Sequence, residues 1–303
     1  MADLPRGREE VRRALSVAGV RPSKARGQNF LVDARAAAEV ADAVLACGAG
    51  DVVEIGPGLG ALTQAVAAVA RHVTCLEIDP RLASWLSQRV AAEGLSNVSV
   101  CEEDAVSFDL GRVSHENRML VVGSIPYSVT APLLQMLIRQ RAALRGAVLI
   151  TQREVAEKIL ASPGKEGTAL GTMVRAYAEV RILRNLSPRS FEPSPEVEST
   201  LWTLTFLSSP RFSSSESSFF RIVRGIYGAR RKTLRNALAR VIPSQDVPRV
   251  LTAAGVDSGL RGETLDFPDL DRMAAELDCL AAAPSAEGEP GSVRRARAPE
   301  KPD

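Results

Sequence analysis

The 303-residue sequence has few histidines, cysteines and aromatic residues, and it has no long apolar run. The two histidines, His72 and His115, are too few for a His-rich metal site or for most histidine-based triads. The four cysteines form no CxxC pair and have apolar neighbours, which indicates thiols in a reducing compartment and argues against a zinc site. No run approaches the roughly 18–20 apolar residues of a membrane span, and the charged N-terminus lacks the apolar core of a secretory signal. These absences favour a cytoplasmic protein that binds no metal and contacts no membrane.

The composition is that of an ordinary globular protein, but the charge is unevenly distributed. Apolar residues make up 45% of the chain and charged residues 24%, which allows a core without disulfides or a structural metal. The net charge is only +2, yet residues 219–240 contain seven cations and no acid: Arg221, Arg224, Arg230, Arg231, Lys232, Arg235 and Arg240. A second basic cluster contains Arg21, Lys24 and Arg26. Such clusters indicate contact with a polyanion, although a single basic helix is equally compatible with a solvated face.

The order of apolar patterns along the chain predicts an α/β fold. Residues 8–18 and 33–47 have the apolar spacing of helices, and residues 19–32 between them carry no strand signal. Five short strands then alternate with three helices; the strands are predicted at 51–55, 73–78, 98–101, 119–122 and 147–151, and the helices at 61–69, 80–93 and 130–141. This alternation indicates βαβ units and a mainly parallel sheet. Two more strands are predicted at 180–186 and 200–207.

A serine-rich stretch predicts a boundary before the C-terminal part of the chain. Residues 208–218, SSPRFSSSESS, have the composition of a linker. Helices are predicted after it at 217–227, 232–241, 246–254 and 268–281, and the tail has almost no apolar residues, which predicts disorder. We therefore expect an N-terminal helix and basic segment over 1–30, an α/β domain over 31–207, a small helical domain over 208–282 and a disordered tail over 283–303.

Residues 52–60, VVEIGPGLG, predict a strand that leads into a glycine-rich turn and a helix. Gly56, Gly58 and Gly60 allow a tight turn and a ligand contact that a Cβ atom would prevent. Glu77 lies at the end of the next predicted strand, where an acid accepts hydrogen bonds from the ribose hydroxyls of a nucleoside cofactor. Together these features predict a nucleoside-cofactor site.

Acidic residues around this turn favour S-adenosylmethionine. Nicotinamide sites usually read GxGxxG and hold a pyrophosphate at a helix N-terminus, whereas here Glu54 precedes the turn. S-adenosylmethionine has no phosphate and carries a cationic ammonium and a sulfonium, so acidic neighbours are favourable. Asp104 follows the third predicted strand, where its carboxylate is placed to accept a hydrogen bond from the adenine amino group.

The run SIPY at residues 124–127 indicates the substrate. A polar–apolar–proline–aromatic run at the end of the fourth strand is typical of methyltransferases that act on exocyclic amino groups of bases. The N6 lone pair of adenine is delocalised, and acceptors at the Ser124 side chain and the Ile125 carbonyl would draw the nitrogen towards sp³ geometry. Pro126 fixes the turn, and Tyr127 offers a face on which an extruded base stacks. No strong base is needed, because the proton becomes acidic once the nitrogen is methylated.

The stretch at 186–200, LSPRSFEPSPEVEST, contains three prolines within eight residues, which lock an extended loop. Phe191 lies among them and is a candidate for the second wall against which the base stacks. The composition is equally compatible with a structural turn.

Taken together, these motifs resemble those of the KsgA/RsmA family of ribosomal RNA adenine N6,N6-dimethyltransferases. The matching blocks are ARGQNFL at 25–31, VEIGPGLGALT at 53–63, LEID at 76–79, EDA at 103–105, SIPY at 124–127, TQREVA at 151–156, FEPSPEVES at 191–199 and RRKTLR at 230–235. They extend over nearly the whole chain apart from the first residues, the serine-rich stretch and the tail.

The resemblance implies a Rossmann-like methyltransferase domain with a small C-terminal helical domain. It implies that S-adenosylmethionine contacts Asn29, Leu31, Gly56, Gly58, Glu77, Asp104 and Ser124. Residues 124–127 would hold the target adenine with Phe191 on its other side, and Arg221, Arg224, Arg230, Arg231, Lys232 and Arg235 would bind RNA phosphates. The implied substrate is a pair of adjacent adenosines in the 3′-terminal hairpin of 16S rRNA in the small ribosomal subunit, and a substrate of this size favours a monomeric enzyme. The N-terminal basic segment would help to cover the active site.

Two positions depart from the family pattern. The family usually has asparagine where this chain has Ser124, whose oxygen lies nearer the backbone by about one bond length. Where the family has the segment Tyr-Gly-x-Leu-Ser, this chain has GTALG at residues 167–171, without the tyrosine and the serine.

Two alternative functions share this fold. One is an enzyme of the Erm type, which methylates one large-subunit adenosine, and the other is a non-catalytic ribosome-assembly factor. The basic residues at 219–240 argue against a small-molecule methyltransferase.

Overall fold

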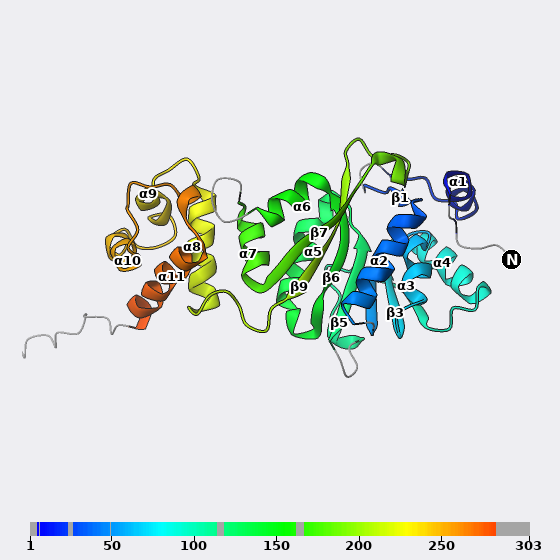
Figure 1. Cartoon of the computed structure of the whole chain (residues 1–303), viewed down its shortest axis with the longest axis horizontal. Coiled ribbons are helices and arrows are strands. Elements are labelled where there is room, and N and C mark those ends of the chain that lie inside the picture. Colours follow the sequence, from blue (N-terminus) through cyan, green and yellow to red (C-terminus); the bar gives the residue numbers. More distant parts are fainter. Residues whose placement is uncertain are drawn as a thin grey trace, which may run out of the picture.

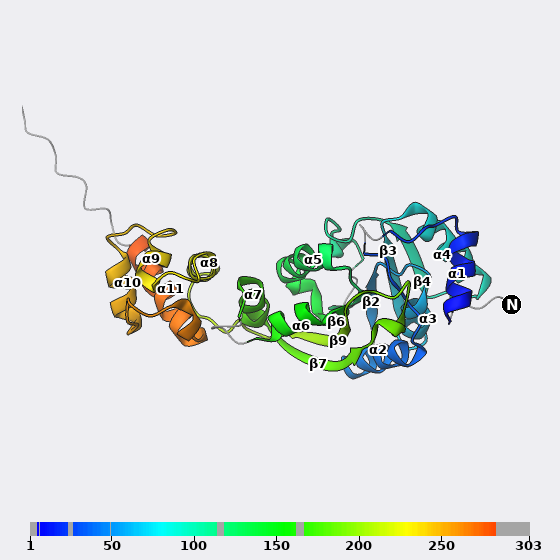
Figure 2. The same cartoon turned by 90° about the horizontal axis from the view of Figure 1, so that it is seen from above.

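The computed structural model describes residues 5, 7–23, 27–48, 50–113, 118–161 and 167–282. They form an α/β part and a smaller helical part that lie side by side along the long axis of the molecule (Figures 1 and 2). Within these residues, no helix is both long and apolar enough to cross a membrane. The predicted tail at 283–303 lies outside the described residues, as do Lys24 and Arg26 of the N-terminal basic cluster.

A seven-stranded sheet forms the centre of the α/β part, with the order β4-β3-β2-β5-β6-β9-β7. The strands are β2 (Asp51–Ile55), β3 (His72–Glu77), β4 (Val98–Glu102), β5 (Met119–Ser124), β6 (Leu144–Gln152), β7 (Ala178–Leu186) and β9 (Ser199–Phe206). The first five strands in this order are parallel to one another, and β9 runs antiparallel to both β6 and β7. All seven overlap the predicted ranges, so the mainly parallel, Rossmann-like sheet is confirmed.

Helices cover both faces of this sheet. Successive strand residues point to opposite faces, so Val52 and Val53 of β2 belong to different apolar clusters. The cluster with Val52 includes residues of α2 (Ala34–Ala46), α3 (Ala61–Ala67) and α4 (Pro80–Ala92). The cluster with Val53 includes residues of α5 (Tyr127–Arg139), α6 (Arg153–Leu160) and α7 (Ala169–Tyr177). Of these helices, α6 and α7 are absent from the predicted elements.

A second, two-stranded sheet connects the N-terminal region to the proline-rich stretch. Strand β1 (Phe30–Leu31) pairs antiparallel with β8 (Phe191–Glu192), so that Phe30 lies opposite Glu192 and Leu31 opposite Phe191. Residues 19–32 carry no strand signal in the sequence, and β1 was therefore not predicted. A ladder of two residues has no periodicity in the sequence, and its partner lies far away along the chain.

The helical part contains α8 (Glu216–Gly228), α9 (Leu234–Leu238), α10 (Val247–Ala254) and α11 (Phe267–Ala282), which overlap the four predicted helices. Aromatic side chains join it to the α/β part. The ring of Phe212 stacks on Phe219 with centroids 4.2 Å apart, and it meets the edge of Tyr177 at 5.5 Å. One apolar cluster consequently includes residues of both parts.

The serine-rich stretch does not behave as a free linker. The backbone N–H groups of Ser213 and Ser214 donate to the carboxylate of Asp271 at 2.9 and 3.0 Å, and that of Ser215 donates to Asp278 at 2.7 Å. Its composition is that of a linker, and in the structure these serines donate hydrogen bonds to acids of α11. The boundary at residue 208 stays a prediction.

Candidate active site

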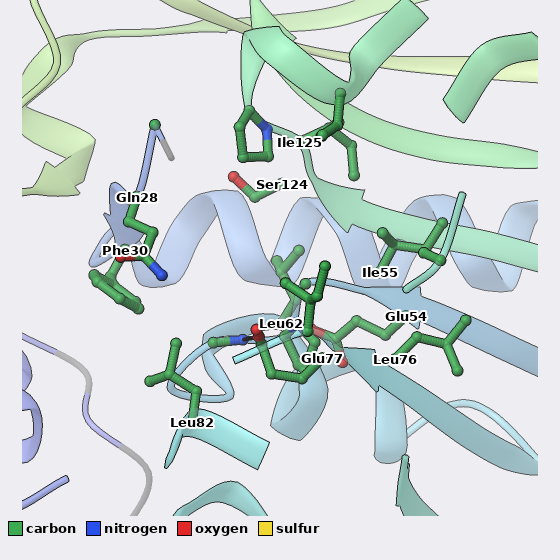
Figure 3. A pocket seen from close by; sticks show the side chains of 18 of the residues that line it. Gln28, Phe30, Glu54, Ile55, Leu62, Leu76, Glu77, Leu82, Ser124 and Ile125 are labelled. Carbon is green, nitrogen blue, oxygen red and sulfur yellow. Dashed lines mark hydrogen bonds between the residues drawn. The ribbon is translucent and has the colours of Figure 1, made fainter. Parts of the chain in front are cut away.

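A cavity of about 460 Å³ opens at the carboxyl ends of β2, β3, β4 and β5 (Figure 3). Ligands of open α/β sheets bind at this edge, because the loops that follow the strands converge there. The cavity is lined by nine residues of the predicted site: Asn29, Leu31, Gly56, Gly58, Glu77, Asp104, Ser124, Ile125 and Pro126. The structure thus brings together the blocks around 29, 56, 77, 104 and 124.

The glycine-rich turn forms the floor of this cavity. Gly56 and Gly58 have left-handed φ values of 62° and 57°, which L side chains rarely adopt. The N–H of Gly58 donates to Oε2 of Glu77 at 3.0 Å, and the N–H of Asp79 donates to Oε1 of the same carboxylate at 2.9 Å. Each carboxylate oxygen keeps further acceptor capacity. Glu77 is therefore fixed in position and still able to accept from a ligand.

Glu54 belongs to the site although it is absent from the predicted contact residues. Its side chain is 1% exposed and lines the cavity, and Sγ of Cys75 lies 3.6 Å from its Oε2 atom. Burial raises the pKa of Glu54 to about 7, although hydrogen bonds from Thr63 and Cys75 favour the ionised form. Burial also raises the pKa of Glu77. The sequence signal that could have identified Glu54 as a site residue is its position just before the glycine-rich turn.

The charges of the cavity fit a cationic ligand. Among its described lining residues, the charged ones are Glu54, Glu77, Glu103 and Asp104, with no lysine, arginine or histidine. A phosphate would meet repulsion at such a lining, whereas an ammonium or a sulfonium would meet attraction. Asp104 accepts from the N–H of Val106 at 2.9 Å, which holds its carboxylate at the end of β4.

The SIPY run connects β5 to α5 at the other side of the cavity. Ser124, Ile125 and Pro126 line the cavity, and the N–H of Ile125 donates to the carbonyl of Ile150 at 2.8 Å, which anchors the turn to β6. Tyr127 begins α5 and is 64% exposed. It does not line the cavity, but it offers an accessible ring directly after the three residues that do.

The structure does not place Phe191 at the cavity. Its side chain is 2% exposed and belongs to the cluster that contains Leu31, Leu186 and Leu201. The expectation that Phe191 forms the second wall of the base pocket stays a prediction. Pairing of Phe191 with Leu31 in the small sheet turns the side chain towards the core.

All six predicted RNA-binding residues are exposed on the helical part: Arg221, Arg224, Arg230, Arg231, Lys232 and Arg235. The guanidinium of Arg230 lies 5.3 Å from the centroid of the Tyr227 ring. On α6, the ammonium of Lys158 pairs with the carboxylate of Glu154.

An acidic cavity at the edge of a Rossmann-like sheet, beside a turn suited to an amino group of a base, defines an S-adenosylmethionine-dependent amino-methyltransferase. Comparison with known proteins identifies the family more closely. Residues 21–271 match the family described as "Ribosomal RNA adenine dimethylase". The chain belongs to this family, and it is accordingly a methyltransferase of ribosomal RNA adenines.

Relatives and solved structures agree with this membership. Ribosomal RNA small subunit methyltransferase A of Moorella thermoacetica is 39% identical over 272 residues, which cover 86% of this chain and 93% of the relative. The protein of the same name from Geobacillus thermodenitrificans is 35% identical over 266 residues, 84% and 90% of the two chains. A dimethyladenosine transferase from Plasmodium falciparum superposes with a TM-score of 0.72 at 25% identity, covering 83% of this chain and 98% of that one. The 23S rRNA methyltransferase ErmE gives a TM-score of 0.64 at 26% identity, covering 82% and 100%.

Proposed function

We propose that this chain uses S-adenosylmethionine to dimethylate N6 of two adjacent adenosines in the 3′-terminal hairpin of small-subunit (16S) rRNA. The observation that carries the proposal is the acidic cavity lined by Ser124, Ile125 and Pro126 of the SIPY run, together with the exposed basic residues of the helical part. The names of the curated relatives support the small-subunit target over the large-subunit alternative.

The cavity supplies separate positions for the parts of the cofactor. Glu77 would accept from the ribose hydroxyls and Asp104 from the adenine amino group, while Glu54 would offset the positive charge. When bound, S-adenosylmethionine supplies an electrophilic methyl group. Asn29 would contact the cofactor from the N-terminal side; its Nδ2 atom already donates to the carbonyl of Gly27 at 3.2 Å.

The SIPY run would prepare the adenine for attack. The Ser124 hydroxyl and the Ile125 carbonyl would accept the two N6 hydrogens and localise the nitrogen lone pair. The exposed Tyr127 ring would stack on the extruded base. After methylation the nitrogen is cationic, so its proton leaves to water, and a buried catalytic base is not required.

The basic helices would supply affinity and register for RNA. Lysine and arginine contacts to phosphates carry no sequence information, so the shape of the hairpin would select the two adenosines. The aromatic contacts at Phe212 join the helical part, which carries these residues, to the α/β part, which contains the cavity.

The proposal is tested by methyl transfer from labelled S-adenosylmethionine to small subunits that lack the hairpin methylation, with large subunits as the comparison substrate. Products are resolved as mono- and dimethyladenosine, and Ser124→Asn is measured in parallel. Dimethyladenosine at two adjacent small-subunit positions supports the proposal and shows that serine replaces asparagine. Transfer to large subunits alone would establish the Erm-type alternative. Binding of cofactor and subunits without transfer would indicate an assembly factor, and activity in the asparagine variant alone would trace that loss to Ser124.

A further inference from the structure

The N-terminal strap, defined as the described residues between Gly7 and Leu31, covers one side of the cofactor cavity. Helix α1 (Arg8–Val17) supplies Val11 to the cavity lining, and β1 supplies Phe30 and Leu31. In Figure 3, Gln28 and Phe30 lie on the side of the cavity opposite Ile55 and Leu76.

The strap has an apolar cluster of its own. It consists of Val11, Ala14, Leu15, Val20 and Phe30 from the strap, with Leu59 and Leu82 from the α/β part. This cluster is separate from the two clusters that flank the central sheet. Leu31 of the strap packs instead in the cluster that contains Val52, and polar contacts attach α1 to the proline-rich stretch as well.

Glu192 supplies the main polar contacts. Its Oε1 atom accepts from Nε of Arg12 at 2.8 Å, and its Oε2 atom accepts from Nη1 of Arg8 at 3.1 Å. Arg8 also donates through Nη2 to the Arg189 carbonyl at 2.8 Å and to the Ser194 hydroxyl at 3.2 Å. We call the Arg8–Glu192–Arg12 arrangement the clasp. The Glu192 side chain is 11% exposed, and its pKa is lowered, first by the hydrogen bond from Arg12.

Glu192 also contacts the C-terminal end of the strap, at β1. The backbone of Glu192 pairs with Phe30 in the small sheet. The Phe30 ring in turn lies against the glycine turn, since a Cβ atom on Gly58 would come within 3.1 Å of two ring carbons. Through its side chain Glu192 positions α1, and through its backbone it positions the residue that covers the cofactor turn.

We infer that Glu192 is a positioning residue that holds the N-terminal strap closed over the cofactor cavity, and that its clasp with Arg8 and Arg12 limits the rate of cofactor and product exchange. The inference rests on the proposed function, because it takes the cavity as the cofactor site. Arg8 and Arg12 are 38% and 63% exposed, so salt weakens the clasp by screening while leaving the apolar cluster in place.

The test is Glu192→Gln in the full chain, with Glu198→Gln as the matched control. Glu198 lies in the same proline-rich stretch and pairs with Arg153 at 2.7 Å, away from the strap. The dissociation rate of S-adenosylhomocysteine is measured by stopped flow at low and high salt, and hydrogen exchange of residues 27–31 is measured without any ligand. Arg12→Met and the double variant Arg12→Met/Glu192→Gln complete a double-mutant cycle.

We expect Glu192→Gln to accelerate dissociation about tenfold, which corresponds to about 1.4 kcal/mol. It should raise the cofactor KM and leave kcat at saturating cofactor unchanged. Salt should accelerate dissociation from the wild type but have much less effect on Glu192→Gln. The double variant should dissociate more slowly than the sum of the two single effects predicts, because both single changes break the same ion pair. A general loss of packing would not remove the salt dependence.

Equal dissociation rates and equal strap exchange in Glu192→Gln and the wild type would overturn the inference. Failure of the wild type to bind S-adenosylhomocysteine would contradict the proposed function instead. In that case the hydrogen-exchange measurement still tests whether the clasp holds the strap. Faster exchange at residues 27–31 in Glu192→Gln, but not in Glu198→Gln, supports this role of the clasp. Unchanged exchange in Glu192→Gln overturns it.

Discussion

The ring of Phe30 lies directly against the backbone of Gly58. A Cβ atom on Gly58 would meet two ring carbons at 3.1 Å, and the φ angle of 57° is itself unfavourable for an L side chain. The glycine is thus required twice, once for the turn conformation and once for the approach of the strap. Neighbouring Gly56 has a similar φ of 62°, but a Cβ atom there would meet no protein atom within 4 Å.

Gly58→Ala should therefore weaken cofactor binding and destabilise the fold. The left-handed conformation alone costs roughly 1–2 kcal/mol for an alanine, and displacement of Phe30 adds to this cost. Gly94→Ala is the control, because its φ is 68°, no atom lies within 4 Å of its Cβ position, and it does not line the cavity. Calorimetric titration with S-adenosylhomocysteine and thermal unfolding check the result. Equal loss of cofactor affinity in both variants would contradict the role of the Phe30 contact.

Burial of Glu54 predicts a stability that falls as the pH rises. The folded-state pKa of about 7 exceeds the usual value of 4.5. Between these values the folded chain retains a proton that the unfolded chain releases, so the free energy of unfolding decreases with rising pH. At about 1.4 kcal/mol per pH unit, the total decrease is on the order of 3 kcal/mol. Glu54→Gln, which is neutral at every pH, should remove most of this decrease in urea titrations at pH 5 and pH 8. Glu102→Gln, exposed on β4, is the control and should keep the wild-type dependence.

The same carboxyl should couple cofactor binding to pH. A cationic ligand favours the ionised form of Glu54, so binding releases a proton when the free site is protonated. Cofactor affinity should then rise as the pH increases from 6 to 8, and Glu54→Gln should flatten this rise. Titration calorimetry in buffers of different ionisation enthalpy measures the proton released. No proton release at pH 6.5 would contradict the coupling, because it would show that the protonation of Glu54 does not change on binding.

The sheet could be predicted from the sequence because its parallel strands are short runs rich in β-branched and other apolar residues between helical segments. Predicted and observed ends differ by one or two residues for most of them. Strand β6 begins three residues earlier than predicted, where Leu144 pairs with Met119. Helix α6 has apolar residues at helical spacing, Val155, Ala156, Ile159 and Leu160, but its eight residues span only about two turns, so it is short for a prediction from periodicity.

Most of the cavity was also predictable, since its residues follow strands and their loops must converge. The residues and contacts that distant segments of the chain add to the site could not be predicted. The sequence shows that Phe191 lies among prolines. It does not show that the Phe191 side chain points into the core, because that direction depends on the pairing of Phe191 with Leu31 in the small sheet. Likewise the sequence shows Glu54 before the glycines, but not that Thr63 and Cys75 enclose its carboxyl. Such facts arise from tertiary contacts that local patterns do not contain.

Tyr127 should affect the reaction of RNA without affecting the cofactor. Its ring is 64% exposed and does not line the cavity, so Tyr127→Ala should leave S-adenosylhomocysteine affinity and thermal stability unchanged. Loss of base stacking, about 1–3 kcal/mol per base, should reduce kcat/KM for small subunits by roughly 10- to 100-fold. Tyr127→Phe keeps the stacking face and should retain most of the activity. An active alanine variant would exclude stacking on Tyr127.

Charge reversal on the helical part should weaken RNA binding alone. Arg230 and Arg231 are exposed, and each contact with a phosphate contributes about −0.7 to −0.9 to the slope of log K against log salt. Arg230→Glu/Arg231→Glu should therefore lower affinity for the rRNA hairpin and flatten its salt dependence, while cofactor affinity stays at the wild-type value. Arg139→Glu/Arg181→Glu is the control, since it makes the same change in net charge at exposed positions on α5 and β7. Filter binding over a range of salt concentrations measures both quantities. Equal loss of RNA affinity in the two double variants would mean that the net charge of the protein, and not contact by Arg230 and Arg231, determines binding. Unchanged RNA affinity in Arg230→Glu/Arg231→Glu would show that these arginines do not contact RNA.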